Sequence, residues 1–371
     1  MPDNGRKSAR IEENRPLQNK IRSRATEEVE EEVYERGPLK MYVREKAWLN
    51  IIQQYLVKRE ADGVSRDIKY FTLPGRYGID IGVLYQAGVV HRQKGKWKNV
   101  AVCDRDYEPE VIQNLGTFAA SSKRPLEHVV NSPRDPLFKF FPVDVINLDF
   151  CNSVLANQDE DTDSIVHTNL NTIQSLFGLQ RGQGFLLLLT HKIGPNDYGG
   201  QVGNILRSTL QFNLSHIPEF RTRFMEVYGT RNINACLQQP LDFSLLTIPK
   251  YVARIADRYG YRIEEQFVGF YPRAHGSYHM GVSSFELEPI GRKPTKRYEP
   301  RFKATSLDLN DLADGLRDES HRLYSEFVSR LPGRQMVDVD SILGSDARLK
   351  RYYTDWGENI KGWWHDIQDQ E

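Results

Sequence analysis

The sequence predicts an α/β protein with a doubly wound, mostly parallel sheet that ends in an antiparallel hairpin pair of strands. Short apolar runs alternate with stretches whose apolar residues recur at helical spacing, and this alternation is typical of βαβ crossovers. Two long strand-like runs, 261–271 and 278–288, then follow each other across the turn His275-Gly276-Ser277, which indicates a hairpin. Helical patterns near both ends of the chain predict N- and C-terminal extensions.

Each element follows from its local pattern. Residues 39–61 carry large apolar side chains at helix-like spacing, and Asp62-Gly63 ends that pattern. Short apolar runs predict strands at 68–73, 99–103, 127–131, 143–148 and 185–190. Residues 185–190 are the clearest case, because a continuous apolar run stands between Gly184 and His191. Helices are expected at 79–88, 109–118, 167–178 and 249–259.

The composition divides the chain into five segments. Residues 1–38 are charged and include the acidic block 27–32. We expect a flexible arm, because these residues would bury too little apolar surface to offset the conformational entropy lost on ordering. An N-terminal helix covers 39–63, an α/β domain 64–290, a basic linker 291–305 and a helical extension 306–371.

Charge and cysteine content exclude some classes of protein. The 371 residues hold 50 Lys and Arg against 50 Asp and Glu, which argues against a globally basic nucleic-acid binder. Three scattered cysteines favour a reducing compartment, and we expect a cytoplasmic protein. The longest apolar run is too short to span a membrane, and the N-terminus lacks an apolar export signal.

Four segments place glycines or polar residues near the ends of expected strands, where α/β sheets bind ligands. They read TLPGRYGIDIGVL, VAVCDRD, EHVVNSP and VDVINLDFC. Together with five βα units and a closing hairpin, they resemble the class I S-adenosylmethionine-dependent methyltransferases over residues 64–290. The resemblance implies a Rossmann-like, methyltransferase-type domain with S-adenosylmethionine as cofactor.

In the first segment, the resemblance implies that Gly75 and Gly78 border the methionine part of the cofactor and that Asp80 belongs to the cofactor-binding residues. A glycine turn lets backbone approach a ligand without a Cβ. Thr72 and Leu73 stand where the family has an acid before its glycines, and Asp80 follows the loop instead. An ordinary strand-to-helix turn is the alternative interpretation.

In the next two segments, the resemblance implies that Asp104 and Asp106 accept hydrogen bonds from ribose hydroxyls and that Asn131 lies near adenine. Asp106 suits a helix N-cap equally well. Asn131 before Ser-Pro is also ordinary turn chemistry.

In the fourth segment, Asn147, Asp149 and Phe150 would face the methyl acceptor. Amino-methylating members of the family carry Asn or Asp, two prolines and an aromatic residue there. The polar side chain accepts hydrogen bonds from the target amine, and the ring stacks on the base. Both prolines are absent here, and a structural role for Asn147 and Asp149 is the alternative.

Other candidates carry weaker signals. Cys151 could be a nucleophile for cytosine methylation, although the family's Pro-Cys pair is missing. His191-Lys192 could supply a general base or be a surface pair. His275 and His279 have no third ligand nearby in sequence, so no metal is expected.

Two basic patches, 91–98 with Trp97 and 291–303 with Tyr298 and Phe302, could contact DNA or RNA. Such surfaces use cations for phosphates and rings for stacking. The charged arm, or the C-terminus with Trp356, Trp363 and Trp364, could bind a protein partner, although the tryptophans could equally pack against the domain. The sequence therefore favours methyl transfer to a nucleic acid. A catalytically inactive binding or scaffold subunit of a multiprotein assembly is the alternative.

Overall fold

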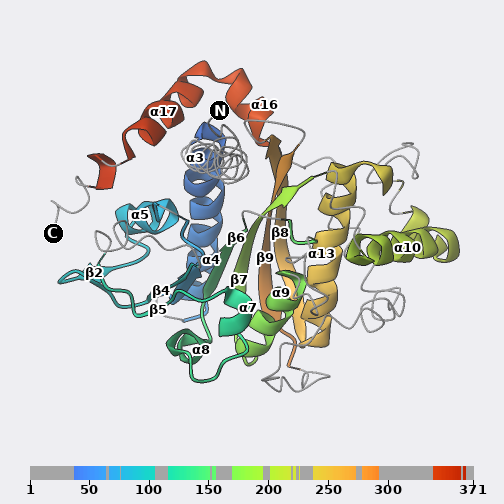
Figure 1. The fold of residues 1–371 in the computed structure, drawn as a ribbon, viewed down its shortest axis with the longest axis horizontal. Coiled ribbons are helices and arrows are strands. Elements are labelled where there is room, and N and C mark those ends of the chain that lie inside the picture. Colours follow the sequence, from blue (N-terminus) through green and yellow to red (C-terminus); the bar gives the residue numbers. More distant parts are fainter. Residues whose placement is uncertain are drawn as a thin grey trace, which may run out of the picture.

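A central sheet with helices on both faces organises the molecule (Figure 1). The computed structural model describes residues 37–63, 67–75, 77–104, 116–150, 153–155, 169–194, 201–218, 220–222, 225, 237–272, 278–291, 337–360 and 362–364. Within these ranges, eight strands form the main sheet in the order β10-β8-β9-β7-β6-β1-β4-β5. The predicted α/β fold with a mostly parallel sheet and a closing hairpin is confirmed.

Five strands make the parallel part: β1 (Tyr70–Thr72), β4 (Val100–Cys103), β5 (Ala120–Ser122), β6 (Val145–Asp149) and β7 (Phe185–Ile193). The hairpin consists of β8 (Tyr261–Pro272) and β9 (His279–Pro289), and β9 pairs antiparallel with β7. The sequence did not predict β10 (Val337–Asp338), which pairs parallel with β8. The C-terminal extension thus adds a strand to the sheet.

Most predicted helices are present. The N-terminal helix comprises α3 (Pro38–Tyr42), the π-helical turn η1 (Val43–Trp48) and α4 (Leu49–Ala61). The sheet is further covered by α5 (Ile79–Gln86), α9 (Asn169–Leu179) and α13 (Pro240–Arg258), which begins before the predicted start and contains Pro249. An additional helix, α10 (Gln201–His216), was not predicted.

The expected strand at 127–131 is wrong. Its residues lie around α7 (Leu126–Val129), and the third parallel strand is β5. Leu126, Val129 and Val130 are buried at i, i+3 and i+4, so they form a helical stripe, and a short apolar run does not distinguish the two structures. The expected helix 109–118 lies outside the described residues except for its last three, which are not helical. The hairpin turn 273–277 also lies outside them.

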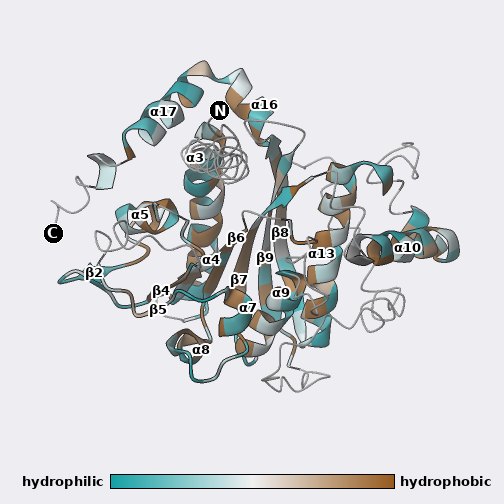
Figure 2. Ribbon diagram, viewed as in Figure 1, coloured by the Kyte–Doolittle hydropathy of each residue, from teal (hydrophilic) through white to brown (hydrophobic). Residues whose placement is uncertain are grey.

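Alternation along the strands sends side chains to two separate cores. Phe71 and Leu148 face the core shared with α9 and α13, whereas Tyr70 and Val145 face the core shared with α4 and α5. Figure 2 shows apolar residues concentrated in the central strands. A third core joins α5 to α16 (Val339–Ser345) and α17 (Ala347–Glu358). In the described part of the chain, we find no helix that is both long and apolar enough to cross a membrane.

Candidate functional site

The sheet has a topological switch point between β1 and β6. From β1 the chain proceeds outward through β4 to β5, and it then returns to place β6 on the other side of β1. Loops at the carboxyl ends of β1 and β6 therefore leave in opposite directions. Open α/β sheets bind ligands at this position.

Four buried polar side chains meet at this switch point. The Asp80 Oδ2 atom accepts hydrogen bonds from the Tyr70 hydroxyl at 2.6 Å, the Thr72 hydroxyl at 2.6 Å and the Asn147 amide at 3.0 Å. Tyr70 and Thr72 are two residues apart on β1 and share a face, and Thr72 lies in register with Asn147 of β6. Gly78, with φ of 53°, turns the chain so that the first turn of α5 brings Asp80 back to the strand.

Burial controls the protonation of this cluster. Desolvation raises the pKa of Asp80, and the nearby Arg44 guanidinium and the three hydrogen bonds oppose this effect. The pKa of Tyr70 is held well above its ordinary value, first by burial and then by the Asp80 carboxylate. Tyr70 therefore keeps its proton and remains a donor to Asp80.

The N-terminal helix contributes two cations to the same edge. Asp149, at the end of β6, pairs through Oδ2 with the Lys40 ammonium at 3.0 Å and the Arg44 guanidinium at 3.2 Å. The side chains of Lys40, Arg44 and Asp149 are 3%, 4% and 10% exposed, so these ion pairs are largely withdrawn from water. Lys40 and Arg44 are four residues apart and therefore lie on one helix face. These contacts fix α3 and η1 over the end of β6.

Three oxygen atoms, two in this cluster and one on the neighbouring Asp149, are enclosed by the protein. Within the described residues, Asp80 Oδ1, Asn147 Oδ1 and Asp149 Oδ1 have no hydrogen-bond partner. A buried polar atom without a partner is costly, and native proteins satisfy nearly all such atoms. All three atoms are acceptors. The cluster is therefore complementary to a ligand that carries N–H donors or a positive charge.

The glycine loop and Asp104 lie at the same edge of the sheet. Gly75 and Gly78 both have positive φ, at 60° and 53°, in the loop from β1 to α5. Asp104 directly follows β4 and is half-buried, and its backbone N–H donates to the Ser122 carbonyl at 3.2 Å. Carboxyl ends of parallel strands share one edge, so these residues belong to the same face as the cluster. Asp106 lies outside the described residues.

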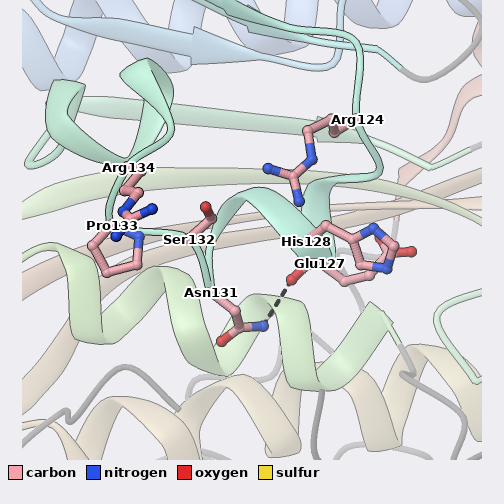
Figure 3. A pocket seen from close by; sticks show the side chains of 7 residues that line it. All are labelled: Arg124, Glu127, His128, Asn131, Ser132, Pro133 and Arg134. Carbon is pink, nitrogen blue, oxygen red and sulfur yellow. Dashed lines mark hydrogen bonds between the residues drawn. The ribbon is translucent and has the colours of Figure 1, made fainter. Parts of the chain in front are cut away.

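The structure does not bring Asn131 and Phe150 to the cluster. Asn131 follows α7, donates to the Glu127 carbonyl at 2.7 Å and lines a cavity of about 520 Å³ together with Arg124, His128 and Arg134 (Figure 3). Phe150 packs into the core on the α9 and α13 face, away from Asn147. The interpretation of Asn131 as a strand-end residue is therefore wrong, and Phe150 is not presented beside Asn147.

His191 is buried rather than part of a surface pair. It is 1% exposed on β7, and desolvation lowers its pKa to about 4. Lys192 is half-buried, with its ammonium 3.9 Å from the centre of the Tyr278 ring. Cys151 and His275 lie outside the described residues, and among those described no three His, Cys, Asp or Glu side chains gather as metal ligands.

The basic patch 91–98 folds into a two-stranded ribbon, β2 (Arg92–Gln93) and β3 (Lys96–Trp97). Trp97 is 1% exposed and packs against Tyr85 and Phe118, so its ring is not available to stack on a base. The expectation of a stacking role for Trp97 is wrong. The second patch, apart from Gly291, lies outside the described residues.

The C-terminal tryptophans pack against the domain. The Trp364 indole donates to the Tyr77 carbonyl at 2.8 Å, and a Cβ on Gly82 of α5 would lie 2.4 Å from the Trp363 ring. Packing, one of the two interpretations of this segment, is confirmed for Trp364, whereas Trp356 and Trp363 stay half-buried.

The sequence analysis did not identify Tyr70 and Thr72 of the polar cluster, nor the two cations that pair with Asp149. Strand alternation could have indicated Tyr70 and Thr72, because it puts them on one face of the strand beside the expected glycine loop. For Lys40 and Arg44 the sequence shows only their i, i+4 spacing on a helix. That spacing does not indicate that their partner is Asp149, more than a hundred residues away.

Comparisons with known proteins cover only part of the chain. A protein-family model described as PP_RS20740-like matches residues 132–241, which is less than a third of the chain. The matched stretch includes β6 with Asn147 and Asp149, but not β1 or α5. No curated protein matches the sequence.

Proposed function

We propose that this protein binds S-adenosylmethionine at the switch point and transfers its methyl group to a nitrogen atom of a nucleic acid. The observation that carries the proposal is the position of the Asp80 carboxylate. It lies at the carboxyl end of β1, 2.6 Å from the Thr72 hydroxyl, with Oδ1 available. The methyltransferases that this chain resembles have an acid at that strand end. Here Thr72 stands at the strand end, and Asp80 brings a carboxylate to the same place from α5.

The chemistry of the cluster fits this cofactor. S-adenosylmethionine carries a cationic ammonium and a cationic sulfonium, and a buried carboxylate with a free oxygen is complementary to such a ligand. Gly75 and Gly78 would offer backbone without a Cβ beside the methionine part, and Asp104 would accept hydrogen bonds from the ribose hydroxyls. When bound, the cofactor supplies an electrophilic methyl group.

The chain's own contribution to the reaction would be orientation. Asn147 Oδ1 and Asp149 Oδ1 are acceptors two residues apart on one face of β6. They would accept hydrogen bonds from the N–H groups of the acceptor nitrogen and direct its lone pair. A correctly held pair of reactants accounts for a large part of enzymatic acceleration.

The ribbon β2–β3 and the residues that flank it support a nucleic acid as the acceptor class. His91, Lys94, Lys96 and Lys98 are exposed there. Their charges suit contacts to phosphate groups, which position a nucleic acid without reading its sequence. Base stacking would have to come from a ring other than Trp97.

Calorimetric titration with S-adenosylmethionine and S-adenosylhomocysteine tests the cofactor assignment. Asp80→Asn keeps the shape of the side chain but replaces one acceptor oxygen with an amide donor, so we expect micromolar binding to be lost. Asp135→Asn is the matched control, because Asp135 is also buried and hydrogen-bonded but caps α8 (Pro136–Phe140). Absence of binding by the unmodified protein, or equal affinity in the Asp80 variant, would overturn the proposal.

Methyl transfer to DNA and RNA is measured separately, with Asn147→Ala as the variant. We expect transfer by the unmodified protein and, in the variant, a much larger loss of transfer than of cofactor affinity, because Asn147 also donates to Asp80. If the variant transfers methyl groups at the rate of the unmodified protein, Asn147 does not contact the methyl acceptor.

A second candidate function is a binding subunit without catalysis. Lys40 and Arg44 favour it, because they neutralise Asp149 and hold the N-terminal helix against the end of β6, on the side where an acceptor would enter. This candidate predicts that the protein transfers no methyl group even when the cofactor binds. It also predicts that Lys40→Met with Arg44→Met does not restore transfer.

A further inference from the structure

A second cavity lies away from the switch point, between α17 and the helices η1, α4 and α5. Its volume is about 570 Å³. Three aromatic side chains, Tyr352, Trp356 and Trp363, line it together with two carboxylates, Glu45 and Asp355. Volumes of about 300 to 1,000 Å³ are typical of sites for small molecules. The cavity is much larger than a single ammonium group requires.

The rings of this cavity are arranged as walls rather than as a stack. The Trp356 and Trp363 ring centres are 5.2 Å apart, and their planes meet at 75°. Tyr352 lies 6.3 Å from Trp356 with an interplanar angle of 39°. Trp356 and Trp363 therefore pack edge to face, with Tyr352 beside them. Ring faces turned toward the cavity would attract an alkylated ammonium group, because the faces of aromatic rings carry negative charge density.

The charge of the lining selects a cation. Among the described residues that line it, the charged ones are Glu45 and Asp355, and both are acidic. Each has a basic neighbour outside the lining, Lys46 at 3.6 Å and Arg351 at 3.8 Å. Both basic side chains are substantially exposed, and ion pairs of this kind contribute little. The cavity therefore keeps an environment that favours positive charge.

A buried donor indicates a second feature of the ligand. In the part of the chain that the structure describes, the Trp356 indole N–H is buried and has no hydrogen-bond partner. A small rotation of the ring would turn this N–H toward the cavity, where an acceptor oxygen on the ligand would satisfy it. The required ligand thus combines an alkylated ammonium group with a hydroxyl or carbonyl oxygen.

We propose that this cavity binds a small quaternary ammonium compound that carries an acceptor oxygen, with choline as the simplest probe. The rings hold the trimethylammonium group, the two carboxylates compensate its charge, and the Trp356 N–H donates to the oxygen. This site is separate from the switch point and does not depend on the function proposed there.

Tryptophan fluorescence of the full chain tests the proposal, because Trp356 and Trp363 line the cavity. Titrations use choline, tetramethylammonium and 3,3-dimethyl-1-butanol, which has the shape of choline without its charge. We expect saturable quenching by choline, weaker binding of tetramethylammonium because it lacks the oxygen, and at least about tenfold weaker binding of the neutral isostere. Equal binding of choline and the neutral isostere, or no saturation with choline, would overturn the proposal.

Variants locate the site. Asp355→Asn changes a side chain that is 67% exposed, so the fold is expected to tolerate it. Combined with Glu45→Gln, it should weaken choline binding about fivefold or more. Glu358→Gln, an exposed position on the same helix but outside the cavity, is the matched control and should leave affinity unchanged. An equal loss in the control would place the interaction elsewhere. Tighter binding of a trimethyllysine peptide than of choline would reject a small molecule as the ligand.

Discussion

Burial of His191 should make the fold lose stability as the pH falls below about 6.5. The side chain is 1% exposed on the central strand β7, and its Nδ1 atom lies 3.4 Å from the Lys192 carbonyl oxygen. On the adjacent strand β9, a Cβ on Gly281 would lie 2.7 Å from His191 Nε2, so the ring fills the space above that glycine. A proton added to this ring would place a charge in the core.

The magnitude follows from the pKa. Desolvation lowers it from 6.5 to about 4. The unfolded chain binds a proton near pH 6.5, whereas the folded protein does so only near pH 4. The stability contributed by the neutral ring is therefore complete above pH 6.5 and is lost as the pH falls through this interval. Since one pKa unit corresponds to about 1.4 kcal/mol, the full loss is about 3.5 kcal/mol, of which about 3 kcal/mol has occurred by pH 4.

Urea unfolding at a series of pH values from 7.5 to 4 measures this effect. We expect the difference in unfolding free energy between His191→Gln and the unmodified protein to change by about 3 kcal/mol across the range. His91→Gln is the control, because His91 is exposed just before β2 and lies outside the core. A difference that stays constant from pH 7.5 to 4 would refute a neutral, buried His191.

Three further predictions concern the switch point and the C-terminal segment. Asp80→Asn should remove a pH dependence of stability that is opposite in sign to that of His191. Burial raises the Asp80 pKa, so the protonated carboxyl stabilises the fold below the ordinary value of 3.8, and this contribution is lost as the pH rises through the raised pKa. Urea unfolding midpoints at a series of pH values measure this difference. Tyr70→Phe should destabilise the fold by about 1–3 kcal/mol in thermal unfolding, since Asp80 loses a buried donor. Gly82→Ala should displace Trp363 and Trp364 and cost about 1–3 kcal/mol, and limited proteolysis should then cut the C-terminal segment faster.

The fold was predictable where the apolar pattern of a segment is clear and long. The continuous apolar run Phe185–Leu189 and the two long hairpin segments identify themselves as strands, and the structure contains β7, β8 and β9 at those places. β5 is different, because Ala120–Ser122 is three small residues with no apolar signal. It is a strand because β4 pairs with it in parallel register, and that partnership is not local information.

The polar cluster was predictable in parts but not as a unit. Asp80 and Asn147 were each identified from a different segment, and the register of β1 with β6 places them 3.0 Å apart. The two cations on Asp149 were not predictable, because Lys40 and Arg44 read as ordinary charged positions on an N-terminal helix. Charge on a helix usually means exposure to solvent, and the sequence contains no sign of the buried partner.

The position of Asp80 shows why motif spacing alone underestimates this site. By sequence, the acid expected at the end of the first strand is missing, and the residue there is Thr72. In the folded protein, the loop that contains Gly75 and Gly78 turns the chain back toward β1. The Asp80 Oδ2 atom then lies 2.6 Å from the Thr72 hydroxyl oxygen. A ligand interacts with the position of a charge and not with its place along the chain. In the function proposed above, a carboxylate on the following helix therefore takes the part of one on the strand, because the turn between them brings it back beside the strand end.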